Sequence, residues 1–463
     1  MQINSPIKRL YEINRTIFFV LVLLGIIFVY YIGNYLAGSL FKYGILFFIG
    51  CLILLRFPFF GFLLLIILIP VEELIVLPGG RTVIFVLGIL VAFFWLINVL
   101  FKNGKICINK NTTLLVVLLF FWALLSFFWA EDQSIVLTRI LNFLNLVIFY
   151  ILFQDFVKDN KRLKTVLFAI FISNVICSIA SIVIESQTGA KRISLTEGQN
   201  PNILSINLGV GLLLVPYIFR NLKNRFLRGL SYIGVFTLII AIILTGSRGT
   251  WLAIPITVLF GWLITKGKIL RIQSGIIPGI ILTLIITLLI HSNFISPYLS
   301  QRFTTMIHPE ETHGGSGRLD IWTVGLAMVE DNPVFGVGLS NFPVRFGDYI
   351  GKRTTWSGYS YGVHSGRDPH NIFLSIQAEL GIIGIFLFFL FIWYIVKPLI
   401  VYLKDIRAVI GILLIIFALI YGFTHTIQWT KIFWLVFAIA TVIPNIIKAE
   451  KNENINTIAY VSK

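Results

Sequence analysis

Apolar stretches about the length of a membrane span alternate with short polar turns along almost the whole chain. A helix needs about 20 predominantly apolar residues to cross a hydrocarbon core of ~30 Å. Continuous apolar runs, rather than alternation of apolar and polar residues, favour helices over a β-barrel. We therefore predict an all-α integral membrane protein with about 12–14 transmembrane helices. The apolar segments lie at about 16–38, 43–55, 57–77, 82–101, 112–129, 134–153, 165–185, 202–219, 229–246, 249–265, 272–291, 371–396, 408–424 and 429–447.

The composition agrees with a membrane protein and changes how the net charge is interpreted. Of the 463 residues, 57% are hydrophobic and only 12% are charged, whereas a soluble domain has roughly 25% charged residues. The formal net charge of +17 could suggest nucleic acid, but in a membrane protein it more often reflects Lys and Arg kept in cytoplasmic loops. We expect membrane lipids as partners and no nucleic acid. The three cysteines lie in or beside apolar runs, without the spacing of a metal site.

Lysine and arginine are distributed unevenly between the two sides that these spans define. If the N-terminus is cytoplasmic, the inner segments carry 23 Lys and Arg and the short outer turns carry seven. Because cytoplasmic loops are enriched in positive charge, both termini are predicted to be cytoplasmic. The predicted parts are an N-terminal transmembrane bundle at 1–291, an extracytoplasmic loop at 292–370, C-terminal transmembrane helices at 371–447 and a cytoplasmic tail at 448–463.

The long polar loop is predicted to contain short helices. Ser316 can cap a helix that lies along the membrane surface and ends at Asn332-Pro333. Its apolar positions recur every three to four residues, at Leu319, Trp322, Leu326 and Val329. A turn at 336–338 and a lid or binding rim at 347–368 are expected to follow. All six histidines fall in this loop or at predicted outer helix ends, so polar groups are expected to gather at one membrane face.

His370 is the strongest candidate for chemistry. Asp368 is a natural N-cap and Pro369 suits the first helical position, which predicts His370 in the first turn of the next span. The positive end of a helix dipole disfavours a protonated imidazole, so a neutral His370 would suit a general base. The same exposed amide groups would attract a phosphate. The alternative is a histidine that only anchors a loop to a helix end.

Three arginines are candidates for binding an anion. Arg248 lies in a short reversal between two spans, flanked by two nearby glycines. Arg318 begins the predicted surface helix, and Arg192 lies in the turn before the segment 200–202. The guanidinium group can grip a phosphate in a forked geometry. The alternatives are contact with lipid headgroups for Arg248 and a solvated ion pair for Arg318.

Two kinds of site are not indicated by the sequence. The acidic residues of the predicted outer loops form no Asp-x-Asp or His-x-x-x-His pattern, so we expect no metal. His308 and His313, five residues apart, are only a weak lead. A phosphate loop of the form Gly-x-x-x-x-Gly-Lys-Ser/Thr is also missing from the sequence, so ATP-driven work is not indicated and no cofactor is expected.

Short motifs follow one another in a characteristic order between about residues 190 and 390. They are Thr245-Gly-Ser-Arg248-Gly, Gly317-Arg318 before Trp322, Asn332-Pro333 followed by Gly336-Val-Gly-Leu-Ser-Asn-Phe342, and Asp368-Pro-His370-Asn371 with Glu379-Leu-Gly-Ile-Ile-Gly384. This set resembles the O-antigen ligase and O-antigen polymerase superfamily of bacterial membrane glycosyltransferases. The many spans and the single long outer loop are similar to that family over nearly the whole chain.

The resemblance implies a reaction and a location. Such enzymes transfer a glycan from undecaprenyl pyrophosphate to an acceptor hydroxyl, with inversion and without a metal, at the outer face of the bacterial cytoplasmic (inner) membrane. Arg248 and Arg318 match the family's pyrophosphate-binding arginines, and His370 matches its essential loop histidine. The implied partners are the undecaprenyl-pyrophosphate-linked glycan donor and a lipid-anchored or other surface glycan acceptor. The set of Arg248, Arg318 and His370 favours the ligase branch.

Other functions remain open at this point. A polymerase of lipid-linked repeat units needs the same residue types, and a protein-directed oligosaccharyltransferase is a further relative. A transporter or flippase is the main rival from another class. Transporters usually place ionisable groups near the membrane midplane and show repeated halves, whereas the charges here avoid the span centres and no internal repeat is evident.

Overall fold

A computed structural model describes residues 48, 50–74, 76, 82–101, 106–188, 192–196, 199–266, 313–353 and 366–461. Within these ranges the long elements are all helical, and nine helices are long and apolar enough to cross a membrane. The prediction of an all-α integral membrane protein is thereby confirmed. The predicted spans at 16–38 and 272–291 lie outside the described residues.

The chain divides into two compact units, and the smaller comprises residues 1–62 and 89–104. Its described part begins with the helix Gly50–Arg56, after which the chain bends by 114° into the segment Pro58–Leu74. That segment consists of α3 (Pro58–Leu68) and the 3-10 helix η1 (Ile69–Leu74), and from Leu63 onward it belongs to the larger unit. The break at Phe57 corresponds to the predicted separation of two apolar stretches at Arg56. The smaller unit also contains most of α4 (Val83–Phe101), from Ile89 onward.

The larger unit contains the remaining spans, which follow the predicted apolar segments closely. Asparagine and aspartate side chains cap several of them: Asn109 accepts a hydrogen bond from the first turn of α5, Asp132 from α6 and Asn224 from α10. The helices are α5 (Lys110–Leu125), η2 (Ser126–Phe128), α6 (Gln133–Phe156), α7 (Asn160–Thr188), α8 (Pro201–Leu213), α9 (Val215–Asn221), α10 (Arg225–Leu244), α11 (Arg248–Thr265), α16 (Ile372–Val401), α17 (Ile406–Gly422) and α18 (Lys431–Val461).

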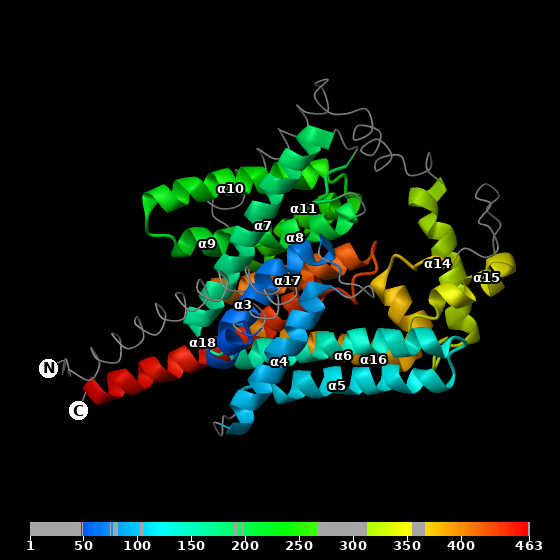
Figure 1. Cartoon of the computed structure of the whole chain (residues 1–463), viewed down its shortest axis with the longest axis horizontal. Helices are drawn as coiled ribbons and strands as arrows, with labels where there is room; N and C mark the ends of the chain where they lie inside the picture. Colours follow the sequence, from blue (N-terminus) through cyan, green and yellow to red (C-terminus); the bar gives the residue numbers. More distant parts are fainter. Residues whose placement is uncertain are drawn as a thin grey trace, which may run out of the picture. The chain divides into compact units, whose positions relative to one another are not determined.

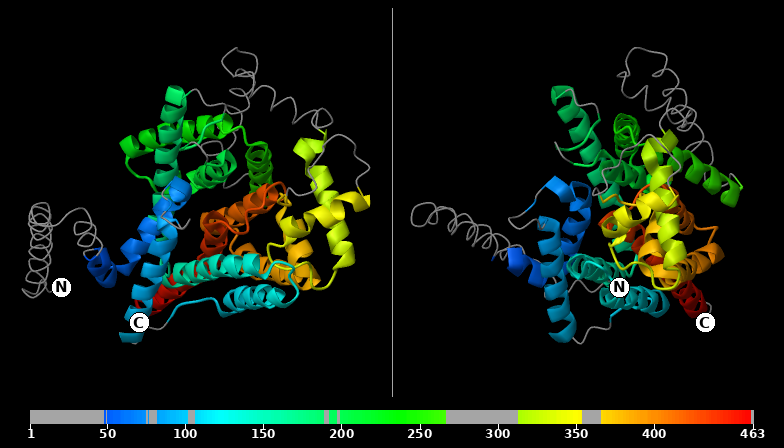
Figure 2. Two further views of the ribbon diagram at one scale, coloured as in Figure 1. Left: turned by 45° about the vertical axis from the view of Figure 1, so that its right-hand side comes forward. Right: turned by 90° about the vertical axis from the view of Figure 1, so that its right-hand side faces the viewer.

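The C-terminal helices form the centre of the larger unit (Figures 1 and 2). α17 packs against α18, α11 and α8, and α16 packs against α5, α17 and α18. The apolar span of α18 is 83% buried inside the protein. A helix that is hydrophobic on all sides is expected in such a central position, because every face then meets another helix.

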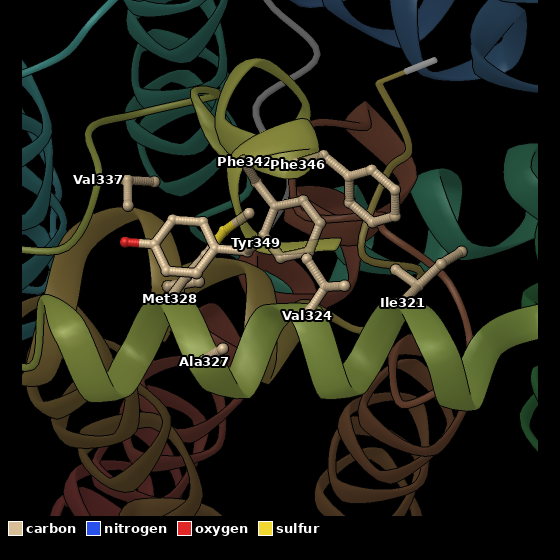
Figure 3. Packing of buried hydrophobic residues seen from close by; sticks show 9 residues of the cluster. Ile321, Val324, Ala327, Met328, Val337, Phe342, Phe346 and Tyr349 are labelled. Carbon is tan, nitrogen blue, oxygen red and sulfur yellow. The ribbon is translucent and has the colours of Figure 1, made fainter. Parts of the chain in front are cut away.

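Two shorter helices of the polar loop pack on one another beside α16. They are α14 (His313–Asp331) and α15 (Phe342–Arg353). Figure 3 shows Phe342 and Tyr349 of α15 lying over Val324 and Met328 of α14, in a cluster whose members are buried. The cluster also contains Val337 and, from α16, Ala378, so it joins the helix pair to α16.

Two details of the predicted loop helix were wrong. α14 begins at His313, so Ser316 lies within the helix and is not its N-cap. The predicted apolar stripe also differs from the buried one, because Leu319 and Leu326 are 43% and 51% exposed. The sequence alone did not indicate that α15 would bury the neighbouring face of α14. The predicted end of the helix at Asn332 was correct within one residue.

α16 is broken at Gly381, and the loop 332–341 fills the break. Gly381 has φ +66° and ψ −165°, a conformation that essentially only glycine adopts. Val337 N–H donates to the carbonyl of Ala378 at 2.8 Å, and Ile382 N–H donates to the carbonyl of Pro333 at 2.9 Å. Backbone groups freed inside a membrane helix must be satisfied by other protein groups, and the loop supplies them here.

Candidate functional site

The start of α16 holds His370 in a position that differs from the predicted one. Asn371, not Asp368, caps the helix, since its side chain accepts hydrogen bonds from Phe373 N–H at 2.9 Å and Leu374 N–H at 3.1 Å. His370 therefore lies just before the cap instead of in the first helical turn. The asparagine after His370 competes successfully for the cap because it reaches the second and third free amide groups.

Neighbouring elements hold His370 in a left-handed backbone conformation. Its φ is +47°, which is uncommon for a residue other than glycine. His370 N–H donates to the hydroxyl of Thr426 at 3.1 Å, and the indole of Trp322 on α14 donates to the carbonyl of Pro369 at 3.1 Å. Contacts from the α17–α18 connection and from α14 thus fix the position of this histidine.

The surroundings of His370 favour its neutral form. Burial and the positive charge of Arg318 lower the pKa of His370, and these effects outweigh the opposing influence of Asp368. The sequence predicted a neutral imidazole from the helix dipole, whereas the main causes are burial and a nearby guanidinium.

A second histidine, His425, lies beside the first in the connection between α17 and α18. Its ring stacks on Tyr421, with 4.3 Å between centroids and 7° between planes. Its Nδ1 is 2.9 Å from the hydroxyl of Thr424. Burial, followed by the charges of Arg318 and His370, lowers the pKa of His425 to about 3. His425 is therefore neutral throughout the physiological range.

Gly249 allows His425 to approach the start of α11. A Cβ atom at this position would lie 2.6 Å from Cε1 of His425 and 2.8 Å from the hydroxyl of Thr424. The preceding residue is Arg248, the first residue of α11. The glycine after Arg248 thus has a close-packing role at the same end of the bundle as the two histidines.

Arg192 connects three chain segments near this cluster. Its Nε donates to the carbonyl of Thr245 at 2.6 Å, and its Nη2 donates to Oδ1 of Asn202 at 2.8 Å. The carbonyl of Asn202 accepts a hydrogen bond from the hydroxyl of Tyr421 at 2.7 Å. Arg192 thus joins the turn before α11, the start of α8 and the end of α17.

The structure brings the four sequence-predicted residues to one end of the bundle. Arg318 acts electrostatically on both His370 and His425, and Arg192 also acts on His425. Arg248 adjoins the same group through Gly249. His425 was recognised in the sequence only as one of six outer histidines. Its position directly after a predicted span, in a short connection rich in Thr and Gln, was the available signal.

Other predictions for the outer loop concern residues that the structure does not describe. His308, His364 and most of the predicted lid at 347–368 lie outside the described residues or in segments whose side chains are not described. Among the described residues, His, Cys, Asp and Glu form no group that could hold a metal ion. The described cluster instead combines guanidinium groups with neutral imidazoles, a set suited to binding an anion and accepting a proton.

Comparison with known protein families gives a match to part of the chain. The model of the O-antigen ligase family matches residues 233–389, about a third of the chain. This range contains Arg248, Arg318 and His370, whereas Arg192 and His425 lie outside it. Curated proteins give no match to the chain. Residues 233–389 of this multi-pass membrane protein are therefore similar to the O-antigen ligase family, which supports a relation to the O-antigen ligase and O-antigen polymerase superfamily.

Proposed function

We propose that this protein transfers a glycan from undecaprenyl pyrophosphate to an acceptor hydroxyl, as O-antigen ligases do, at the outer face of the bacterial cytoplasmic membrane. The similarity of residues 233–389 to the O-antigen ligase family supports an enzyme of surface polysaccharide synthesis. The observation that carries the finer proposal is the grouping of Arg318 and Arg192 around two histidines whose pKa values are lowered. The uneven distribution of Lys and Arg supports the outer location.

The proposed reaction assigns separate tasks to the arginines and to His370. The bond between the anomeric carbon and the pyrophosphate oxygen breaks, and its electron pair leaves with the pyrophosphate. The acceptor oxygen attacks the anomeric carbon from the opposite face, which inverts its configuration. Arg248 and Arg318 stabilise the charge that grows on the leaving pyrophosphate, and His370 accepts the acceptor's proton.

The lowered pKa of His370 supports its role as a base. A general base must be unprotonated before reaction, and burial together with Arg318 favours that form. Binding the pyrophosphate needs a positive charge, and accepting the proton needs an uncharged imidazole. One arrangement therefore meets both needs. The guanidinium group that would bind the pyrophosphate also keeps the neighbouring imidazole neutral.

The proposal can be tested with purified protein in vesicles that contain the host's undecaprenyl-pyrophosphate-linked glycan and its acceptor. His370→Ala is expected to reduce transfer by about 10²–10⁴-fold and to retain donor binding. Arg345→Ala is the matched loop control, because Arg345 pairs with Glu131 and Asp348 and is not among the charges that shift the pKa of His370 or His425. Near-normal transfer by His370→Ala would contradict the proposed base.

The product distinguishes the two branches of the superfamily. A glycan on the separate acceptor indicates a ligase, whereas a longer chain on undecaprenyl pyrophosphate indicates a polymerase. Movement of the lipid-linked glycan across the membrane without a covalent product would instead indicate a flippase.

A further inference from the structure

A small pocket with polar and apolar walls shares chain segments with the histidine cluster but is not used in the proposed transfer step. It has a volume of about 250 Å³ and is formed by η1, the start of α8 and the α17–α18 connection. This is slightly below the range of about 300–1,000 Å³ typical of pockets for drug-sized ligands. The pocket therefore suits one small ring rather than an extended chain.

The walls of the pocket combine a carboxylate, amides and an aromatic ring. Glu73, Gln199, Asn207 and Trp429 all line it. Glu73 is solvent-exposed and Trp429 is half-buried, so both can be reached by a ligand. Asn207 is 1% exposed, and its Oδ1 has no hydrogen-bond partner among the described residues. A buried amide oxygen without a partner is unusual and indicates a polar group that a bound molecule could satisfy.

An ion pair fixes one wall of the pocket. Lys431, at the start of α18, pairs with Glu72, and the hydroxyl of Thr82 donates to the same carboxylate at 3.4 Å. Gln199 is similarly fixed, since Leu195 N–H donates to its side-chain oxygen at 2.8 Å. These bonds hold the wall in place, whereas Glu73 presents its carboxylate beside it.

The pocket and the histidine cluster share two short segments. Asn200, the N-cap of α8, donates a backbone hydrogen bond to Glu73. Two residues later, Asn202 binds both Arg192 and Tyr421. In the α17–α18 connection, His425 belongs to the cluster and Trp429 lines the pocket. The pocket is therefore connected to the histidine cluster through the start of α8 and through the α17–α18 connection.

We infer that this pocket binds a single sugar residue of the glycan substrate. Carboxylate and amide groups form strong hydrogen bonds with neighbouring hydroxyls, and an aromatic ring provides an apolar surface for the C–H face of a pyranose. Glu73 disfavours a phosphate, because Lys431 is already paired with Glu72. The buried Asn207 amide disfavours a lipid tail. This inference rests on the proposed glycan transfer, because that reaction brings a sugar to this end of the bundle.

Binding can be measured without turnover, which separates this inference from the proposed function. The purified full-length protein is titrated with methyl glycosides of glucose, galactose, mannose, rhamnose and N-acetylglucosamine, with saturation-transfer NMR as the readout. We expect at least one glycoside to bind the wild type. Glu73→Gln should weaken that binding by about tenfold or more. The matched control is Glu185→Gln, because Glu185 lies on α7 and does not line the pocket.

Two results would overturn the inference: no binding of any of these glycosides, or equal binding by the wild type and Glu73→Gln. Trp429→Phe provides a second variant that keeps an aromatic ring, and it should bind more tightly than Trp429→Ala. A protein that binds a glycoside in this pocket but never transfers a glycan would contradict the proposed function and leave the sugar site intact.

The KM values of the two substrates distinguish whether the donor or the acceptor supplies the sugar that binds in the pocket. In the vesicle assay, Glu73→Gln should raise the KM of one substrate by about tenfold with little change in kcat. A raised KM for the undecaprenyl-pyrophosphate-linked glycan places the donor's sugar in the pocket, and a raised KM for the acceptor places the acceptor's sugar there. Unchanged KM values for both substrates would count against the inference.

Discussion

The two ends of the helix bundle both contain arginines, but the arginines have different neighbours. At the end that carries His370 and His425, Arg192 donates to a carbonyl and an amide oxygen, and Arg318 lowers the pKa values of both histidines. At the opposite end, Arg407 binds the carboxylates of Asp405 and Glu450, each at 2.7 Å. We refer to these as the histidine end and the Arg407 end.

The pKa shifts at the two ends reflect the different neighbours of their arginines. At the Arg407 end, burial opposes ionisation of Asp405, but hydrogen bonds from Arg407 outweigh it and lower the pKa of that carboxyl. The charges there neutralise one another and join α7, α17 and α18. At the histidine end, positive charge acts on neutral imidazoles. The first arrangement suits a structural connection, and the second suits an incoming anion.

The largest effect should come from removing a guanidinium at the histidine end. Arg318→Ala is expected to reduce transfer by about 10²–10³-fold, the usual result of removing one group that stabilises developing charge. The unfolding temperature should change little, because the Arg318 side chain is partly exposed and lies in the first half of α14. Transfer rates and unfolding temperatures of the purified variant test this. If Arg318→Ala lost its fold together with its activity, Arg318 would have a structural role and not the proposed one.

The spans could be predicted from the sequence because each apolar run has the length of a helix across the membrane. The break in α16 could not, since the apolar pattern continues through Gly381 and the break depends on hydrogen bonds from residues more than 40 positions away in sequence. The same limit applied to the site. Motif order predicted Arg248, Arg318 and His370, whereas His425 is related to them only by its position in the fold, beside Gly249 and near Arg318.

The broken helix α16 is a second difference between the ends, because the break lies toward the histidine end and the loop inserted there leads to α15. Gly381→Ala should destabilise the protein by about 2 kcal/mol or more, since its backbone conformation is essentially restricted to glycine. The added Cβ would also overlap the carbonyl of Val334. Thermal unfolding measures the loss.

Gly229→Ala is the control for this substitution. Gly229 lies within α10, and a Cβ there meets nothing within 4 Å. Alanine should therefore stabilise that helix by about 0.5–1 kcal/mol. Equal unfolding temperatures for the two alanine variants would contradict the proposed role of Gly381.

At the Arg407 end, a substitution should affect stability more than transfer. Arg407→Ala removes the shared partner of Asp405 and Glu450 and a bond to Asn160. The Arg407 side chain is 12% exposed but its partners are more accessible, so we expect a loss of about 1–3 kcal/mol, below that for a fully buried pair. Folded Arg407→Ala should transfer the glycan at nearly the wild-type rate. A large loss of transfer in a variant of unchanged stability would contradict a purely structural role for the Arg407 end.

The smallest effects should come from two exposed charges beside His370, and their opposite signs make them informative. Arg367 lowers the pKa of His370 and Asp368 raises it. In the proposed reaction His370 is a base in its neutral form, so transfer should be lost as pH falls through its pKa, which lies below the usual value of about 6.5. Arg367→Gln should raise that pKa and move the acid limb of the pH–rate profile upward by about a few tenths of a unit. Asp368→Asn should lower it and move the limb downward. The two substitutions remove charges of opposite sign, so their effects on the pKa of His370 must be opposite. If the acid limbs of the two variants moved in the same direction, the group that titrates would not be His370.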